Sequence, residues 1–202
     1  TVGNMIYIAD SLNGLVVLDI SNPSSPSMIS LEAMNFDTST GGGIDVVGNT
    51  AYIAADYGGS TELSIYNVTD PVNPVVLGSY SNNTIGYDVA VFGKHAYLAS
   101  GSSGLRILDI SSPSNPTHRS TFDTDGSARG VDVVFPYAYV ADNISGLHVL
   151  DITNPTAPTL KGTYAAASSA LGVKVVGNKA YVSDGTTTLQ VIDLGTEFLP
   201  DA

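Results

Sequence analysis

The feature that most constrains this chain is a short apolar phrase, AYIAD or a close variant, that recurs five times. The tyrosines of the five copies are separated by 45, 45, 42 and 42 residues, and they are Tyr7, Tyr52, Tyr97, Tyr139 and Tyr181. A second phrase resembling GLVVLDI follows each copy, and a Pro-rich turn follows the first four of these pairs. Repeats of this period fold as solenoids or propellers, because one unit buries its apolar face only against a neighbour.

Each repeat divides into four apolar runs separated by Gly, Asn, Asp and Pro, which predicts four short antiparallel strands, named a to d in chain order. Strand a is typified by GIDVV from Gly43, strand b by the tyrosine phrase, strand c by GLVVLDI from Gly14, and strand d by PVVLGSY from Pro74. Units this small must stack on one another to bury both faces. The predicted fold class is therefore all-β, a β-propeller of four-stranded antiparallel blades with about five repeats. We expect one domain, 1–202, with repeats near 1–42, 43–85, 86–129, 130–171 and 172–202.

The phrases GLVVLDISNPSSP, GLRILDISSPSNP and GLHVLDITNPTAP, together with AY(I/L/V)A, resemble the LVIVD-repeat family of bacterial and archaeal β-propellers. The resemblance covers nearly the whole chain. The resemblance implies an extracellular or cell-surface protein. Because members of this family have no catalytic residue in common, it also implies a scaffold for protein or glycan contacts.

The first and last repeats are irregular. The residues before Met5 supply only the tail of a strand a, and nothing after Leu194 supplies a convincing strand d. We expect either that the chain is part of a longer propeller or that its open edge strands are completed in trans, which gives an oligomer. The second repeat also departs from the pattern, with Asn67 where the other four carry Asp.

Composition excludes some function classes. With 7 basic against 19 acidic residues the formal charge is -12, which repels phosphate backbones and argues against nucleic acid as a partner. The chain has no cysteine, so thiolate catalysis and disulfides are ruled out. No apolar run approaches the roughly 20 residues that span a bilayer, and we expect no direct membrane insertion.

Two sets of acids recur. The acid that ends strand c precedes a turn. A short carboxylate can accept hydrogen bonds from the backbone N–H groups of such a turn, so we interpret this acid as structural. The strand-a acids Asp45, Asp88 and Asp132 are predicted to face the central channel at one level, where they could hold Ca²⁺. The fourth copy of that strand places Lys174 at the same level, which favours ion pairing over a metal. We therefore expect no cofactor, with Ca²⁺ as the weaker alternative.

Signatures of enzymes are scarce. The histidines His95, His118 and His148 fall at three different positions of their repeats, in no metal-ligand spacing, and are expected at the surface. We identify no catalytic residue. The alternative is a propeller hydrolase or lyase that uses Asp132 or Asp88 with a His or Tyr from another blade.

Loop variation predicts the binding face. The a–b and c–d turns are nearly constant, whereas the b–c and d–a loops, which emerge on the other side of a propeller, vary in length and composition. The candidate contacts on this variable-loop face are Phe36, Asp37, Tyr57, Glu62, Asn82, Asp123, Arg129 and Asn143. The candidates for N-glycosylation, if the protein is secreted by an organism that glycosylates, are Asn67, Asn82 and Asn143.

Overall fold

The computed structural model describes residues 3–10, 14–32, 42–57, 61–165, 169–185 and 188–195, without the side chains of 32, 55–57 and 61. These residues form five antiparallel sheets and no helix. Sheet by sheet, the strands are β1 (Met5–Asp10), β2 (Gly14–Asp19) and β3 (Ser27–Glu32); β4 (Ile44–Val47), β5 (Thr50–Tyr57), β6 (Thr61–Asn67) and β7 (Val75–Ser81); β8 (Asp88–Phe92), β9 (His95–Ala99), β10 (Leu105–Asp109) and β11 (Thr117–Phe122); β12 (Gly130–Val134), β13 (Tyr137–Ala141), β14 (Leu147–Asp151) and β15 (Thr159–Tyr164); and β16 (Ala170–Val176), β17 (Lys179–Asp184) and β18 (Leu189–Asp193). We call them the first to the fifth sheet.

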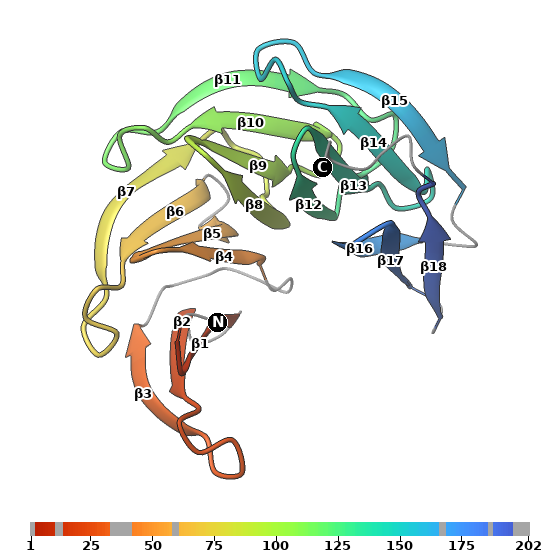
Figure 1. The fold of residues 1–202 in the computed structure, drawn as a ribbon. Coiled ribbons are helices and arrows are strands. Elements are labelled where there is room, and N and C mark those ends of the chain that lie inside the picture. Colours follow the sequence, from red (N-terminus) through yellow and green to blue (C-terminus); the bar gives the residue numbers. More distant parts are fainter. Residues whose placement is uncertain are drawn as a thin grey trace.

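The five sheets stand side by side in an arc around a common centre (Figure 1). In each sheet the strands follow chain order, with β4, β8, β12 and β16 innermost and β3, β7, β11 and β15 at the outside. The prediction of a-b-c-d meanders is confirmed in the second to fourth sheets. In the described part of the chain the first sheet lacks an inner strand and the fifth lacks an outer one, and a gap separates these two sheets in Figure 1.

The five tyrosines occupy one position of the fold. Each lies on the second strand of its repeat and pairs with the residue at the equivalent position of the third strand. The pairs are Tyr7 with Val17, Tyr52 with Ile65, Tyr97 with Ile107, Tyr139 with Val149, and Tyr181 with Val191. The predicted equivalence of these residues is therefore confirmed.

The core consists of four apolar layers, one between each pair of successive sheets. Side chains of a strand alternate between its two faces. On β13, Tyr139 and Ala141 pack toward the fifth sheet, whereas Ala138 and Val140 pack toward the third. The strand-b phrase is continuously apolar because both faces of this strand are buried.

The interpretation of the strand-c acids as turn residues is supported in every sheet. The side-chain oxygen of this residue accepts the backbone N–H two positions later, at 2.7–2.9 Å, in Asp19, Asn67, Asp109, Asp151 and Asp193. Side-chain hydrogen bonds, from a Ser or Thr hydroxyl of the turn or, at Asp193, from Lys179, are the main cause that lowers the pKa of all four aspartates, and these backbone hydrogen bonds add to the effect. No helix that could span a membrane occurs among the described residues.

Candidate functional site

The inner-strand acids do not all lie at one level. Asp45 and Asp132 pair across the sheet with the strand-b tyrosines, as Lys174 does, but the residue at this position of the third sheet is Ala90. Asp88 lies two residues earlier, opposite Ala99. The prediction that Asp88 shares the level of Asp45 and Asp132 is therefore wrong.

The spacing to the tyrosines explains the difference. Eleven residues separate Gly86 from Tyr97, whereas nine separate the corresponding glycine and tyrosine in the second, fourth and fifth repeats. The third repeat thus has two additional residues between this glycine and the tyrosine. An alignment on the Gly-x-Asp phrase does not reveal them, but the strand pairing does.

Each inner-strand acid joins its sheet to the next one. Its Oδ2 accepts a backbone N–H from the inner strand of the following sheet, Asp45 from Val91 at 2.8 Å, Asp88 from Val131 at 2.9 Å and Asp132 from Val175 at 2.7 Å. In all three contacts the donor lies on the inner strand of the following sheet, one residue after the position that corresponds to the acid. The acids therefore serve the stacking of sheets, whatever else they bind.

These acids also line a depression of about 210 Å³ at the inner strands, together with Lys174. Lys174 Nζ lies 2.8 Å from Asp132 Oδ1. Burial raises the pKa of Asp88 to about 6, and the negative charges of Asp132 and Asp45 add to this effect. Among the described residues no three His, Cys, Asp or Glu side chains are grouped so that they could hold a metal ion. The ion pair predicted for Lys174 is thus present, and the question of Ca²⁺ is left to the experiment proposed below.

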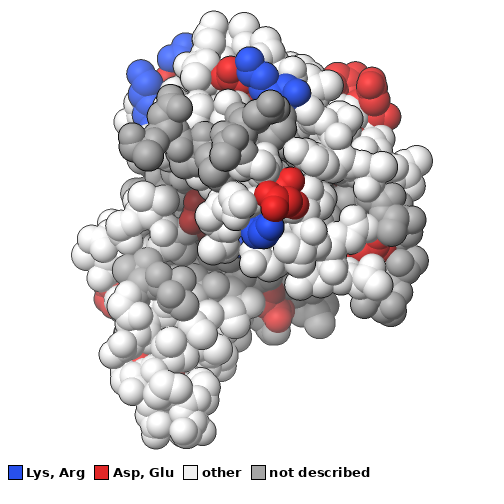
Figure 2. Space-filling model, turned by 45° about the vertical axis from the view of Figure 1, so that its right-hand side comes forward, with Lys and Arg blue, Asp and Glu red and all other residues white. Residues whose placement is uncertain are grey.

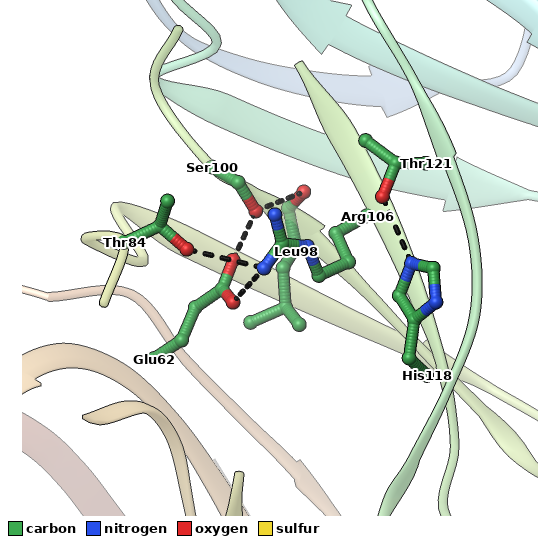
Figure 3. A network of polar contacts seen from close by, with 7 residues as sticks. All are labelled: Glu62, Thr84, Leu98, Ser100, Arg106, His118 and Thr121. Carbon is green, nitrogen blue, oxygen red and sulfur yellow. Dashed lines mark hydrogen bonds and ion pairs between the residues drawn. The ribbon is translucent and has the colours of Figure 1, made fainter. Parts of the chain in front are cut away.

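A second cluster lies on the variable-loop face between the second and third sheets (Figure 3). The carboxylate of Glu62 is fully buried, and its Oε2 lies 2.6 Å from Nη1 of Arg106, whose side chain is 6% exposed. The same nitrogen donates to Thr84 Oγ1 at 3.1 Å, and Ser100 Oγ donates to Glu62 Oε1. With its side-chain carbonyl turned toward Arg106, the amide of Asn82 also accepts from this guanidinium.

Polar residues recur at this position of strand c. The residues that correspond to Arg106 are Ser64, His148 and Gln190, each placed by its pairing with strand b, and only the first sheet has an apolar residue there, Val16. His148 is only 6% exposed and lies 3.5 Å from Asp142, so the expectation that it is a surface residue is wrong. Burial raises the pKa of Asp142, whose Oδ1 accepts from Thr124 at 2.7 Å. Sequence analysis missed this recurrence, although a polar residue at one position of an apolar strand is the signal that reveals it.

A pocket of about 230 Å³ opens beside the Glu62–Arg106 pair, between the β7–β8 and β9–β10 loops. Its lining includes Thr84, Tyr87 and Ser100. The guanidinium of Arg129 lies 4.0 Å from the centre of the Tyr87 ring, a cation–π contact. Thr84 and Ser100 line the pocket and also hydrogen-bond to the buried Glu62–Arg106 pair. The ion pair therefore fixes the position of these two side chains in the pocket wall.

The predicted binding residues have different fates. Glu62 lies beneath the pocket, Asn82 faces Arg106, and Arg129 lies on a ring of the lining. Asp123 is an exposed residue of the next d–a loop, and Asn143 lies in the following b–c loop, where its backbone pairs with that of Ala170. Phe36 and Asp37 lie outside the described residues, as does the side chain of Tyr57.

The three sequon asparagines lie at the end of a strand or in loops. Asn67 Oδ1 accepts from Thr69 N at 2.9 Å in the c–d turn of the second sheet, while Asn82 and Asn143 lie in loops of the variable-loop face. Glycosylation at these three residues stays a prediction.

Five antiparallel meanders set around one centre, with their first strands innermost, define a β-propeller. The family model described as the LVIVD repeat matches residues 2–31, 86–124, 125–166 and 167–195, which is more than half of the chain. The chain therefore belongs to the LVIVD-repeat family, and the resemblance inferred from its phrases is confirmed. The unmatched residues 32–85 contain the second sheet, whose strand c carries Glu62 where three other repeats carry Gly, and Asn67 where all four others carry Asp.

Solved structures of low sequence identity share the fold. The computationally designed Ika8 protein is 9% identical with a TM-score of 0.69, over 97% of this chain and 57% of that one. A functionally unknown protein from Desulfotomaculum acetoxidans is 14% identical with a TM-score of 0.68, over 92% and 64%. The designed Ika4 protein is 9% identical with a TM-score of 0.59, over 78% and 94%. The chain thus spans less than two thirds of the length of two of these structures, and no curated protein matches it.

Proposed function

We propose that this chain is a non-catalytic, extracellular or cell-surface scaffold that binds a protein or glycan at the pocket beside Tyr87. The observation that carries the proposal is the composition of this pocket. An aromatic ring stands next to the hydroxyls of Thr84 and Ser100 on a wall that a buried ion pair supports. Hydroxyl groups beside a ring, with the guanidinium of Arg129 on that ring, suit a polar ligand.

The size of the pocket limits what enters it. At about 230 Å³ it is smaller than the roughly 300–1,000 Å³ of sites for drug-sized ligands. One unit of a longer ligand therefore fits, such as a single sugar residue of a glycan or one side chain of a protein.

A glycan array followed by titration calorimetry tests this function. Tyr87→Ala removes the ring, and Ser102→Arg fills the mouth of the pocket. We expect each variant to weaken binding at least tenfold. Phe92→Ala is the matched control, because Phe92 is 44% exposed at the other end of the strand that follows Tyr87. Unchanged binding in both pocket variants, with folding verified by circular dichroism, would show that the ligand binds elsewhere.

A propeller enzyme is the second candidate, favoured by the convergence of Asp45, Asp88, Asp132 and Lys174 on the inner depression. The predicted His or Tyr partner is not among the residues that line it. Screening for hydrolase and lyase activity, with Asp88→Ala and Asp132→Ala as paired variants, separates the candidates. Turnover that both substitutions abolish in folded protein would favour the enzyme.

Self-assembly is part of the proposed function. Within the described residues β1 pairs only with β2, and β18 pairs only with β17. Edges of this kind accept a strand from another chain. Extracellular or surface location is tested by fractionating the source cells and locating the chain with a specific antibody.

A further inference from the structure

The turn between the first two strands of a sheet departs from its pattern in the third and fourth sheets. In three sheets this two-residue turn begins with a glycine at φ +58° to +61°, and these are Gly48, Gly93 and Gly177. The fourth sheet has Phe135 and Pro136 instead. The residue before the turn is Phe92 in the third sheet, where the others have Val47, Val134 and Val176. The fold therefore requires no aromatic residue at either position.

The two unusual residues meet at the surface. The ring centroids of Phe92 and Phe135 are 4.9 Å apart, and the ring planes differ by 8°, so the rings are stacked. Phe92 is 44% exposed and Phe135 is 42% exposed. Exposed apolar surface of this kind, when it lies beside a groove, is typical of a ligand-binding site.

A pocket of about 230 Å³ opens beside the two rings, between the third and fourth sheets. Besides Phe92 and Phe135, its mostly apolar lining includes Tyr97 of β9 and Ile152 and Pro155 of the turn after β14. A cavity of roughly 150 Å³ already admits a benzene ring, so one aromatic ring fits here. The turns that form this pocket emerge opposite to the variable-loop face, which carries the Tyr87 pocket.

Lys94 is the basic residue of this pocket, and it is exposed. All seven Lys and Arg residues of the chain lie among the described residues. Arg129 contacts the Tyr87 ring, and the five that form ion pairs with acids are Arg106, Arg119, Lys161, Lys174 and Lys179. Figure 2 shows such groups, in which basic residues stand beside acidic ones on a mostly uncharged surface. Lys94 is thus the one described cation with neither kind of partner.

The neighbouring charges leave Lys94 available. His95 pairs with Asp109 across β9 and β10, and the carboxylate of Asp109 lies 2.5 Å from Arg119 Nη2. Burial lowers the pKa of His95, so this imidazole is neutral at pH 7. The positive charge of the pocket at neutral pH is therefore that of Lys94.

We propose that this pocket binds an aromatic carboxylate, with the ring of the ligand against Phe92 and Phe135 and its carboxylate on Lys94. Aromatic rings attract one another in stacked and edge-on arrangements, and a carboxylate is a strong hydrogen-bond partner of an ammonium group. A small aromatic acid carries this combination, as does a peptide that ends in an aromatic residue. The inference goes beyond the proposed function, because the site lies on the opposite face from the Tyr87 pocket.

Titration of the ¹⁵N-labelled chain, followed by NMR, tests the site. The probes are 3-phenylpropionate, its uncharged counterpart 3-phenylpropionamide, and the peptide acetyl-Gly-Gly-Phe with a free carboxylate. Phe135→Ala removes one ring and Lys94→Gln removes the charge, and both residues are exposed, so folding should survive. Lys179→Gln is the matched control, because Lys179 directly follows the corresponding turn of the fifth sheet and is paired with Asp193.

We expect 3-phenylpropionate to cause saturable shifts of the Gly93 and Lys94 amides, and Phe135→Ala to weaken its binding at least fivefold. Lys94→Gln should weaken it about threefold, as is typical of an exposed charge pair, and leave binding of the amide unchanged. Lys179→Gln should bind both like the wild type. Tighter binding of the peptide than of 3-phenylpropionate would assign the site to a peptide end, and the reverse order would assign it to a small acid.

Three results would overturn the inference. They are the absence of saturable shifts in this pocket, equal affinity of the wild type for the acid and the amide, and unchanged binding of the acid in Phe135→Ala. Glycan binding is measured in parallel with Tyr87→Ala, which should leave the affinity for 3-phenylpropionate unchanged. Failure of this inference is therefore distinguishable from failure of the proposed function.

Discussion

The buried ion pair between Glu62 and Arg106 gives the sharpest test of the energetics. Arg106→Met keeps most of the side-chain volume and removes the charge. The carboxylate of Glu62, which is fully buried, then retains only the hydroxyl of Ser100 among its side-chain partners described above. Removing one partner of a buried pair typically costs about 3–5 kcal/mol, because the other charge is left uncompensated. For a chain of this size that corresponds to a fall in Tm of about 10 °C.

Replacing both partners should recover most of the loss. The double variant Glu62→Met/Arg106→Met leaves no buried charge, and apolar replacement of a whole pair is often neutral. We expect its free energy of unfolding to lie within about 1 kcal/mol of the wild type, and the coupling energy between the two sites to be at least about 2 kcal/mol.

Urea unfolding at 25 °C, followed by circular dichroism, measures these differences. Arg119→Met is the matched control. Arg119 lies 2.5 Å from Asp109, but its side chain is 42% exposed, and surface pairs contribute only about 0–1 kcal/mol. The reasoning is refuted if Arg106→Met costs no more than Arg119→Met, or if the double variant loses the sum of the two single effects.

Three further predictions concern the inner strands. Because the pKa of Asp88 is raised to about 6, folded protein binds more protons at this group than unfolded protein between about pH 4 and 6, so its contribution to stability falls as pH rises through this window. Unfolding at pH 4 and pH 6.5 should show the wild type losing roughly 2–3 kcal/mol relative to Asp88→Asn, and parallel pH profiles would contradict the cause. Gly43→Ala should destabilise by several kcal/mol, because its Cβ would lie 2.6 Å from Asp88 Cα, whereas Gly48→Ala, in open space at φ +59°, should cost about 1 kcal/mol. Ca²⁺ added to metal-free protein should leave Tm unchanged, and calcium-dependent melting that disappears in Asp88→Ala would establish the alternative.

Much of the fold could be predicted from the chain because it depends on local patterns that recur. Alternating and continuous apolar runs, turn residues and the spacing of five tyrosines predicted the sheets, their strand order and the equivalence of Tyr7 to Tyr181. The role of the strand-c acids was also predictable, since an Asx turn involves residues only two positions apart. That the described residues of the first and last sheets form only three strands each was expected from counting strands.

The level of Asp88 was not predictable from the phrases alone, because register depends on pairing with strand b and not on distance from a glycine. The pairing of Glu62 with Arg106 was hidden for another reason. These residues are 44 positions apart and meet only when the second and third sheets stack. His148 is buried through the same stacking, although its place in the chain resembles that of a solvated residue.

The amino-acid sequence by itself determined the repeat, its four strands and the all-β class, since each of these depends on the periodicity of side chains along one strand or turn. Only the tertiary structure decided which polar residues are buried and where the pocket opens. Those properties depend on contacts between sheets, and a sheet buries a face only when a neighbour covers it.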